Sequence, residues 1–481
     1  MRHVIKPHRE LGDIDIAAIK IDPRSRDDIP AILLGLQHLY CDRELRARLF
    51  ALLEEHLAPH VSHDLGRPGM ALWQILVMGV LMQGLNCDYD RLCQFVNHHD
   101  VVRRFLGHAD IWDRRRYSYQ SVVDNVRLLT PELLAKVGQL VVESGHKVSK
   151  KKPGGLLHGR CDSFVVETDV HYPTDVNLLW DAMRCLIREC GRAASGCGLD
   201  GWRQWRYLTT AIKGRFHAVR KTRWAGPEDV KACLDLCRKL VVRAEGTLSE
   251  LQDPRTRRLP GKGNPASIGH FIGHAKRQID QVDRRLLKGE TIPHGEKVFS
   301  IFEDHTRWIS KGKAGVPVEL GVPVCIVEDG FGFLLNHRIM WDGSDVDHAV
   351  PVIEETQARF PDFRACSFDR GFHSPENRLD LDTLLDHNVL PGKGCLGRAD
   401  RIREGEETFV AMRRQHPAVE SAINNLEHRG LDRVRAHGSG GFERVVGLSV
   451  LAFNIHRPGL LIRRRRQVLL KRRRERLPLA A

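Results

Sequence analysis

The sequence predicts an α/β protein with a mixed β-sheet core, an all-helical region before that core, and a helical insertion inside it. Three observations support this expectation. Apolar residues recur at helical spacing between residues 69 and 150. A β-prone run follows at 161–170, and the next one starts only at residue 316. After residue 316, strand and helix patterns alternate, which is typical of sheets whose strands are joined by helices.

The composition is that of a chain able to bury large cores. It has 481 residues, of which 42% are hydrophobic, enough for several domains. The longest apolar run, 72–85, contains two glutamines and is too short to span a bilayer, and the first ten residues lack the apolar centre of a signal peptide. The twelve cysteines are scattered, which favours reduced thiols over a disulfide framework. We therefore expect a cytoplasmic protein.

Positive charge is concentrated near the C-terminus. The formal net charge is +14, and residues 457–476 contain ten Lys or Arg against a single Glu, so nine of the net positive charges lie there. Basic segments of this kind bind phosphate backbones irrespective of sequence. Residues 458–481 are therefore predicted to be a basic tail that projects from the protein and binds DNA through Arg463, Arg464, Arg465 and Arg466. We therefore expect the protein to associate with the nucleoid.

Two segments precede the sheet. Residues 1–68 are mixed in composition and contain one amphipathic stretch, 43–57. Residues 69–150 have the pattern of a helical domain, with helices predicted at 72–85, 89–96, 119–129 and 131–143 and a short one ending near residue 107. Arg103, Arg104 and residues 114–116 form a basic group. This group fits a DNA-binding module, and it also fits a docking or dimer domain with a solvated basic face.

Residues 151–173 and 299–457 are predicted to form one sheet core around a helical insertion, 174–298. Within the insertion, helices are predicted at 178–190, 228–251 and 268–287. The basic stretches between them contain Trp202, Trp205 and Trp224. Such stretches suit a surface that lies against DNA or a second subunit, although ordinary packing of the tryptophans explains them equally well.

The second half of the core alternates strands with helices. Apolar residues at every second position predict a strand at 316–326, and Asp329 with Gly330 predicts a hairpin turn. The elements expected after this turn are a strand at 331–340, a helix capped by Ser344, a strand ending at Asp369, a helix at 375–387, a short strand at 389–390, and a helix at 416–430 that begins with Pro417 and ends at Gly430.

Three carboxylates on separate elements are candidate site residues. Asp369 follows a short buried strand, at the place where open α/β sheets bind ligands, although it can also simply cap the next turn. Asp162 precedes the apolar run of the first strand, and Asp169 and Asp175 compete with it. Glu420 stands one position off the apolar stripe of its helix, so it can lean over the sheet edge, whereas most such glutamates face solvent.

The segments that contain these acids are CDSFVVETDVHYPTDVNLLWD (161–181), SFDRGFHSPEN (367–377), AVESAINNLEHRGLDR (418–433) and GFERVVGLSVLAFNIHR (441–457). They resemble the Asp-Asp-Glu motifs of bacterial insertion-sequence transposases with a ribonuclease H-like core, the ISNCY group in particular. The resemblance covers roughly residues 69–457 and is weakest in the N-terminal helical part. It departs from the family around the glutamate. Many members have Tyr, Arg and Lys where this chain has Arg413, His416 and Glu427.

The resemblance implies a ribonuclease H-like mixed sheet and a DNA transposase. Such an enzyme cleaves at the ends of an insertion element and transfers the freed 3′-hydroxyl strand to target DNA. Asp162, Asp369 and Glu420 would hold two Mg²⁺ ions, with Mn²⁺ as a substitute, and Asp162 would bridge both. The implied partners are element ends and target DNA, bound by a homodimer or a higher oligomer, with no membrane.

Further phosphate contacts are expected from Lys311, Lys313, Arg370 and Arg413. Two alternative functions remain open on the same fold. One is a metal-dependent nuclease that cuts without strand transfer, and the other is a transposase-derived DNA-binding protein without catalysis. The three intact acids argue against the second alternative.

Overall fold

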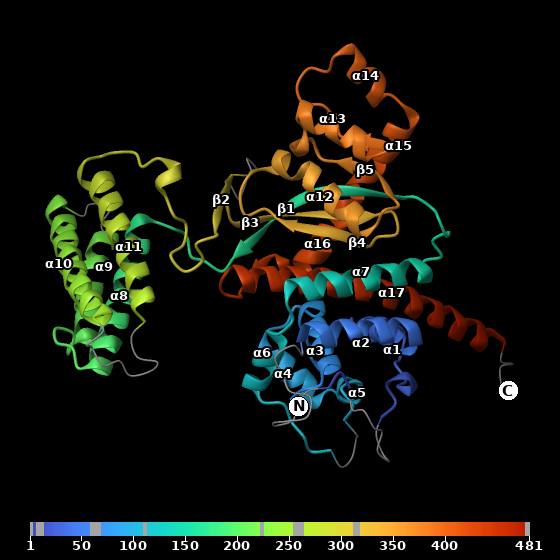
Figure 1. Ribbon diagram of the computed structural model, residues 1–481, viewed down its shortest axis with the longest axis horizontal. Coiled ribbons are helices and arrows are strands. Elements are labelled where there is room, and N and C mark those ends of the chain that lie inside the picture. The colour runs from blue at the N-terminus through green and yellow to red at the C-terminus, as the bar shows by residue number, and fades with distance from the viewer. Residues whose placement is uncertain are drawn as a thin grey trace. The chain divides into compact units, whose positions relative to one another are not determined.

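The computed structural model describes residues 3–5, 14–57, 69–108, 113–221, 226–253, 264–310 and 318–476. These residues form a mostly helical α/β protein with one seven-stranded mixed sheet and an N-terminal helical region, as the sequence predicts (Figure 1). The chain divides into two compact units. The first unit comprises Met1–Asp169 and Gly321–Ala481, and the second comprises Val170–Leu320.

The N-terminal part of the first unit is a helical layer around the buried helix α3. Its helices are α1 (Ile29–Cys41), α2 (Arg43–Leu57), α3 (Leu72–Gly84), α4 (Tyr89–His98), α5 (Asp100–Phe105), α6 (Tyr119–Val126) and α7 (Pro131–Val148). Thr130 caps α7 by accepting the N–H of Leu133, and a proline occupies the first turn, as expected at a helix start. The apolar faces of these helices share one core with the C-terminal helix α17 (Ser439–Arg476).

Helix α17 runs unbroken across Pro458, where a separate basic tail was expected to begin. The Pro458-Gly459 pair is a helix-breaking signal, but here Gly459 allows α17 to pack backbone to backbone against α1. A Cβ at Gly459 would lie 1.8 Å from the carbonyl oxygen of Ala31, and one at Gly35 would lie 2.1 Å from that of Ile455. The helix therefore continues past residue 458 through tertiary packing, and the predicted tail begins within α17.

Within the described residues, the segment Ser439–Arg472 of this helix is long and apolar enough to cross a membrane, judged by length and composition alone. In its apolar window 67% is buried inside the protein, which is the burial of a core helix. Leu448, Leu451 and Ile455 belong to the core of the N-terminal helices, and Val446 and Val450 to a second core on the sheet. Helix α17 therefore lies between the helical layer and the sheet (Figure 1).

Five strands form the main path of the sheet, in the order β2-β3-β1-β5-β6, while β4 pairs with β3 and β7 with β1. Strand β3 is antiparallel to β1 and to β4, whereas β5 runs parallel to β1 and to β6. The strands are β1 (Leu157–Thr168), β2 (Arg307–Ser310), β3 (Val318–Asp329), β4 (Leu334–Ile339), β5 (Phe363–Phe368), β6 (His387–Val389) and β7 (Arg433–Val434).

The two faces of the sheet are covered by different helices. Cys161 of β1 belongs to the core shared with α12 and α13, while Phe164 and Val166 belong to the core shared with α16 and α17. Odd positions of β1 therefore face one helical layer and even positions face the other. The helices of the core are α12 (Asp345–Arg359), α13 (Pro375–Leu384), α14 (Arg398–Glu404), α15 (Glu407–Gln415) and α16 (Val419–Leu426).

The predicted hairpin turn after β3 is present and is organised by Asp329. Its Oδ1 atom accepts the N–H groups of Phe331 and Phe333, and its Oδ2 atom lies 2.5 Å from Nε2 of His146 on α7. The returning strand begins at Leu334, later than the sequence suggests, because this carboxylate binds the preceding N–H groups. The turn also ties α7 to the sheet through a fully buried carboxylate.

The described part of the second unit contains a bundle of four helices: α8 (Asp175–Cys197), α9 (Trp205–Lys221), α10 (Pro227–Gln252) and α11 (Pro265–Val282). The sequence predicts three of them, and it wrongly assigns α9 to a connecting stretch. Trp202 is buried in the bundle and donates its Nε1–H to Thr247 at 2.8 Å, so this tryptophan belongs to the core. Trp224 lies outside the described residues.

All twelve cysteines are free thiols. Cys185, Cys190, Cys233 and Cys237 are buried in the core of the bundle, which is the packing role that their helical spacing suggests.

Candidate active site

The register of two parallel strands brings Asp162 and Asp369 side by side. Cys161 of β1 pairs with Phe368 of β5, and this is the last pair of that ladder. Asp162 and Asp369 are the next residues along the chain, and adjacent strands lie about 5 Å apart. Residues opposite each other on neighbouring strands point to the same face. Both aspartates therefore face the layer that contains α16.

Glu420 approaches from that layer. Its helix, α16, packs on the sheet through Val419, Ile423 and Leu426, and Glu420 stands beside this stripe in the first turn. A 3-10 turn, His416–Ala418, precedes the helix, and Gly430, with φ of 95°, breaks the helical conformation in the segment Glu427–Leu431 that follows it. A left-handed conformation of this kind is easily adopted only by glycine. Pro417 therefore lies in the turn that precedes α16 and Gly430 at the break that follows it, while the α-helix itself is shorter than the predicted 416–430.

The pKa of the Asp162 carboxyl is affected by the other acids nearby. Burial, with the negative charges of Asp369, Glu420 and Asp345, raises the pKa of the Asp162 carboxyl to about 7, although a hydrogen bond from the Ser163 N–H opposes the shift. Asp369 and Glu420 are exposed, and Asp162 is half-buried. Like charges gathered at one buried group destabilise its ionised form. A cation bound among them would relieve that repulsion.

Asp345 is an acid that the sequence reasoning missed. It lies in the first turn of α12, and its Oδ1 atom accepts the hydroxyl of Ser163 at 2.6 Å. A Cβ at Gly371, in the turn after Asp369, would lie 2.6 Å from Asp345 Oδ2. The sequence contains only a capping signal here, Ser344 followed by Asp347, because the contact with Ser163 joins residues 182 positions apart.

Among the described residues, Asp162, Asp369 and Glu420 do not form a group whose three candidate ligand atoms all lie within 4.8 Å of one another. In the described part of the chain, the group whose three candidate ligand atoms lie within 4.8 Å of one another is His270, His274 and Asp304, in the other unit. A pair of divalent ions is itself about 3.5–4 Å wide and needs donors on both sides. Carboxylate oxygens are the ligands that Mg²⁺ prefers, so three acids on neighbouring elements fit such a pair by their chemistry.

A neutral histidine lies next to this acidic edge. Ser367 of β5 contacts Nδ1 of His416 at 3.0 Å, and both residues are buried. Burial, with the nearby Arg413 guanidinium, lowers the pKa of His416 to about 4, although Asp369 opposes the shift. Arg413 itself donates to the carbonyl oxygen of Phe368 at 2.8 Å. These residues position the end of β5, and therefore Asp369.

Asp169 and Asp175, the competing acids, occupy different environments from Asp162. Asp169 is exposed and lies just beyond the end of β1, seven positions after Asp162, which is about 23 Å along an extended strand. Asp175 is the first residue of α8 and pairs with Arg285 at 2.9 Å. The strand register therefore selects Asp162 as the neighbour of Asp369.

The predicted phosphate contacts differ in their availability. Arg370 is exposed beside Asp369, and Arg464 and Arg466 are exposed on α17. Arg463 donates to the carbonyl oxygens of Pro23 and Asp27, and Arg465 to that of Val148, so these two guanidinium groups hold α17 in place. Lys311 and Lys313 lie outside the described residues.

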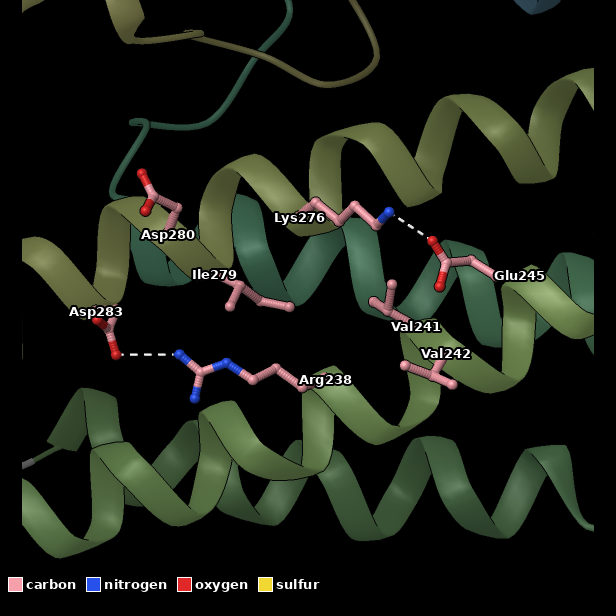
Figure 2. Close-up of a pocket in the computed structure, with 8 residues that line it drawn as sticks. All are labelled: Arg238, Val241, Val242, Glu245, Lys276, Ile279, Asp280 and Asp283. Atoms are coloured by element: carbon pink, nitrogen blue, oxygen red, sulfur yellow. Dashed lines mark hydrogen bonds and ion pairs between the residues drawn. The ribbon is translucent and has the colours of Figure 1, made fainter.

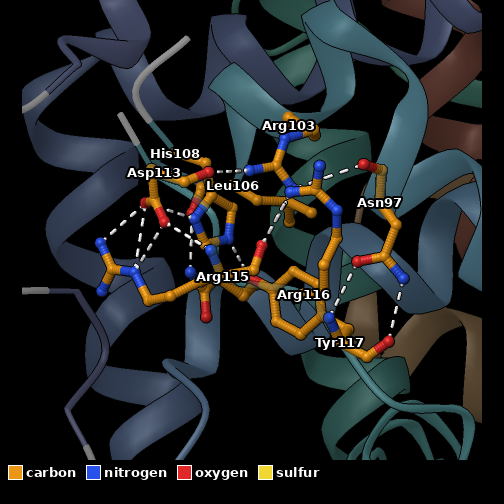
Figure 3. Close-up of polar contacts among 9 residues, drawn as sticks. Asn97, Arg103, Leu106, His108, Asp113, Arg115, Arg116 and Tyr117 are labelled. Carbon is orange, nitrogen blue, oxygen red and sulfur yellow. Dashed lines mark hydrogen bonds and ion pairs between the residues drawn. The ribbon is translucent and has the colours of Figure 1, made fainter. Parts of the chain in front are cut away.

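The basic group of the N-terminal helices is partly structural (Figure 3). Arg103 donates to the carbonyl oxygens of Asp113, Arg115 and Asn97. His108 lies between Asp113 and the Tyr117 hydroxyl, at 2.8 and 2.7 Å, and the Arg115 guanidinium lowers the pKa of Asp113. Arg103 therefore organises the loop after α5, while Arg114 and Arg116 remain exposed.

A groove of about 320 Å³ lies between α10 and α11 in the second unit (Figure 2). Its charged side chains are paired across the groove, Arg238 with Asp283 at 3.1 Å and Lys276 with Glu245 at 2.5 Å. Val241 and Ile279 form the apolar floor between these pairs. Because the charges neutralise one another, the groove lacks the convergent polar groups of a typical ligand site.

Comparison of the chain with protein-family models, with curated proteins and with solved structures found no match.

Proposed function

We propose that the protein is a DNA transposase of the Asp-Asp-Glu type, with a ribonuclease H-like core. The observation that carries the proposal is the β1–β5 register, in which Asp162 and Asp369 follow paired residues on parallel strands. Burial, with the charges of Asp369 and of Glu420 on a helix of the same face, raises the pKa of Asp162. The strand connections agree with such a core, since β1, β3 and β4 are successive antiparallel neighbours and β5 and β6 extend the sheet in parallel.

Asp162, Asp369 and Glu420 are the residues that would hold divalent cations, Mg²⁺ or Mn²⁺. Bound there, the cations would stabilise charge on the attacking and leaving oxygens of a phosphodiester. Asp345 acts on the site indirectly, because it holds the hydroxyl of Ser163, whose N–H binds Asp162. The first turn of α12 adds the positive end of a helix dipole beside these carboxylates.

The proposed reaction has two steps at one site. Water first attacks the phosphorus at an element end, and the P–O3′ bond breaks to leave a 3′-hydroxyl. That hydroxyl then attacks a phosphorus of target DNA, so that one P–O bond forms while another breaks and a target 3′-hydroxyl is released. Arg370, next to Asp369 and exposed, is placed to contact the phosphate backbone there.

Two exposed basic surfaces support DNA as the substrate. The end of α17 carries Arg464 and Arg466. In the second unit, residues 202–221 contain six Lys or Arg and no acid, and Arg206, Arg215 and the 69%-exposed Tyr207 lie on the solvent side of α9. Basic side chains interleaved with an aromatic ring suit a nucleic-acid backbone and its bases.

The test uses a plasmid that carries the DNA flanking the gene, incubated with the full-length protein and Mg²⁺. We expect cleavage and strand-transfer products, and a loss of at least about 100-fold in Asp162→Asn, Asp369→Asn and Glu420→Gln, since even changes to the outer partners of metal ligands cost 10–100-fold. Asp169→Asn is the matched control and should retain activity. Full activity in any of the first three variants would remove that residue from the site. Cleavage without strand transfer would indicate a nuclease, and binding without cleavage a non-catalytic DNA-binding protein.

A further inference from the structure

The second unit contains a cluster of metal-ligating side chains that the proposed reaction does not use. His270 and His274 lie four residues apart on α11, and Asp304 follows in the segment after that helix. One candidate ligand atom from each lies within 4.8 Å of the others. The two imidazole rings are 4.5 Å apart, and Nε2 of His274 is 3.6 Å from Oδ1 of Asp304.

The local sequence explains why these three side chains meet. A spacing of four residues places both histidines on one face of α11, while Ile268, Phe271 and Ile272 turn toward the core of the bundle. The segment with Asp304 is anchored there by the buried Ile301. Ser300 fixes its turn by accepting the N–H groups of Phe302 and Glu303, at 3.1 and 3.0 Å.

The protonation of the rings suits metal binding. Nε2 of His270 contacts the carbonyl oxygen of Ile301 at 3.2 Å. A carbonyl only accepts, so Nε2 carries the proton and Nδ1 keeps its lone pair in the neutral ring. A backbone carbonyl in this role is typical of metal-bound histidines. Nδ1 of His274 is a buried atom without a hydrogen-bond partner among the described residues.

We propose that His270, His274 and Asp304 bind one divalent transition-metal ion of the Zn²⁺ class. Two imidazoles and one carboxylate match the ligand preferences of such ions and leave a fourth position for water. His270 and Asp304 are exposed, so solvent reaches the site, while His274 is buried and positions it. The bound ion links α11 to the segment that leads into β2, and this role is independent of the carboxylates on the sheet.

The experiment measures Zn²⁺ binding to the full-length protein by calorimetry, and Co²⁺ binding by its visible spectrum. With excess Mg²⁺ present to occupy the sheet carboxylates, we expect one further site, whose Co²⁺ spectrum lacks thiolate charge-transfer bands. Affinity should fall at least about 10-fold in each of His270→Ala, His274→Ala and Asp304→Asn, because each variant removes a direct ligand. His217→Ala, which removes an exposed histidine of α9, is the control and should bind like the wild type.

Several outcomes would overturn the proposal. Thiolate bands would assign the ion to cysteines such as Cys233 and Cys237, and unchanged affinity in all three variants would assign it elsewhere. Loss of the site in Asp369→Asn would place it among the sheet acids. Circular dichroism of each variant without metal shows whether the variant is folded. A folded variant that no longer binds the ion supports the site. If His270→Ala is unfolded, His270→Gln takes its place. Failure of this proposal leaves the DNA-cleavage assay unaffected.

Discussion

At the scale of single residues, the most informative group is Asp162. Its ordinary pKa is 3.8, and burial with three neighbouring acids raises it to about 7. The folded chain therefore binds more protons than the unfolded chain between about pH 4 and pH 7. Folding stability falls as the pH rises through that window, and the loss is complete above pH 7. The site is thus built at a cost to stability, as is common for functional sites.

We predict that Asp162→Asn is more stable than the wild type above about pH 7, on the order of 1–4 kcal/mol, and equal to it below about pH 4. The variant has no carboxylate to ionise among Asp369, Glu420 and Asp345. Denaturant unfolding across this pH range, without divalent cations, measures the difference. Adding Mg²⁺ at high pH should stabilise the wild type more than the variant.

The control for this prediction is Asp169→Asn, which removes an exposed acid at the far end of β1. Its pH profile should run parallel to that of the wild type. If the pH profile of Asp162→Asn is also parallel to that of the wild type, the pKa of Asp162 is not raised in the folded protein. The proposed cation site then loses its electrostatic basis.

At the scale of elements, the packing of α1 on α17 organises the first unit. The two helices approach until backbone meets backbone at Gly35 and Gly459. Such an approach requires residues without a Cβ, and it brings the last helix of the chain into the core of the first helices. The basic half of α17 is held by the same docking, since Arg463 and Arg465 donate to backbone carbonyls of other segments.

We predict that Gly459→Ala lowers the free energy of unfolding by about 1–3 kcal/mol, the usual cost of overpacking. Alanine favours helices by up to about 1 kcal/mol over glycine, so the clash with Ala31 must exceed that gain. Gly440→Ala, in the same helix, has open space around its Cβ and should be neutral or stabilising. Equal stability of the two variants in thermal unfolding would contradict this prediction. It would show that α1 shifts to make room for the added Cβ without lowering the free energy of unfolding.

At the scale of the whole molecule, the net charge of +14 is distributed unevenly. The C-terminal half of α17 was expected to project freely as a phosphate-binding tail. Arg463 and Arg465 donate to backbone carbonyl oxygens, although Arg465 is exposed. Among the first four arginines, the role therefore falls chiefly to Arg464 and Arg466, which are both exposed. Leu469 is 57% exposed and Val468 is 50% exposed, and residues 468–472 of the helix are all exposed.

We predict that Arg464→Ala with Arg466→Ala flattens the salt dependence of DNA binding by about 0.9 in log–log slope for each phosphate that is no longer neutralised. The effect should be the same on unrelated duplexes, because phosphate contacts do not read sequence. The matched pair Arg463→Ala with Arg465→Ala should change the slope less and lower the melting temperature more. Affinity measured against salt for both double variants decides between these roles, and equal slopes would reject the assignment.

Much of the local structure follows from the sequence alone. Residue types typical of helix ends predict the helix boundaries near Thr130, Pro417 and Gly430. The alternation of apolar residues before Asp329 predicts β3 and its hairpin. These signals involve neighbours within a few residues, so they can be identified without knowing the fold. The same reasoning nominated Asp162, Asp369 and Glu420, because each stands at the end or edge of a recognisable element.

The tertiary structure decided what depends on interactions between distant residues. The register of β1 on β5 selects Asp162 over Asp169 as the neighbour of Asp369, and the hydroxyl of Ser163 brings Asp345 to the same edge. Close packing on α1 carries α17 through Pro458 into the core. None of these is encoded in a local pattern, because hydrogen-bonded registers and backbone packing are settled only when the whole chain minimises its free energy together.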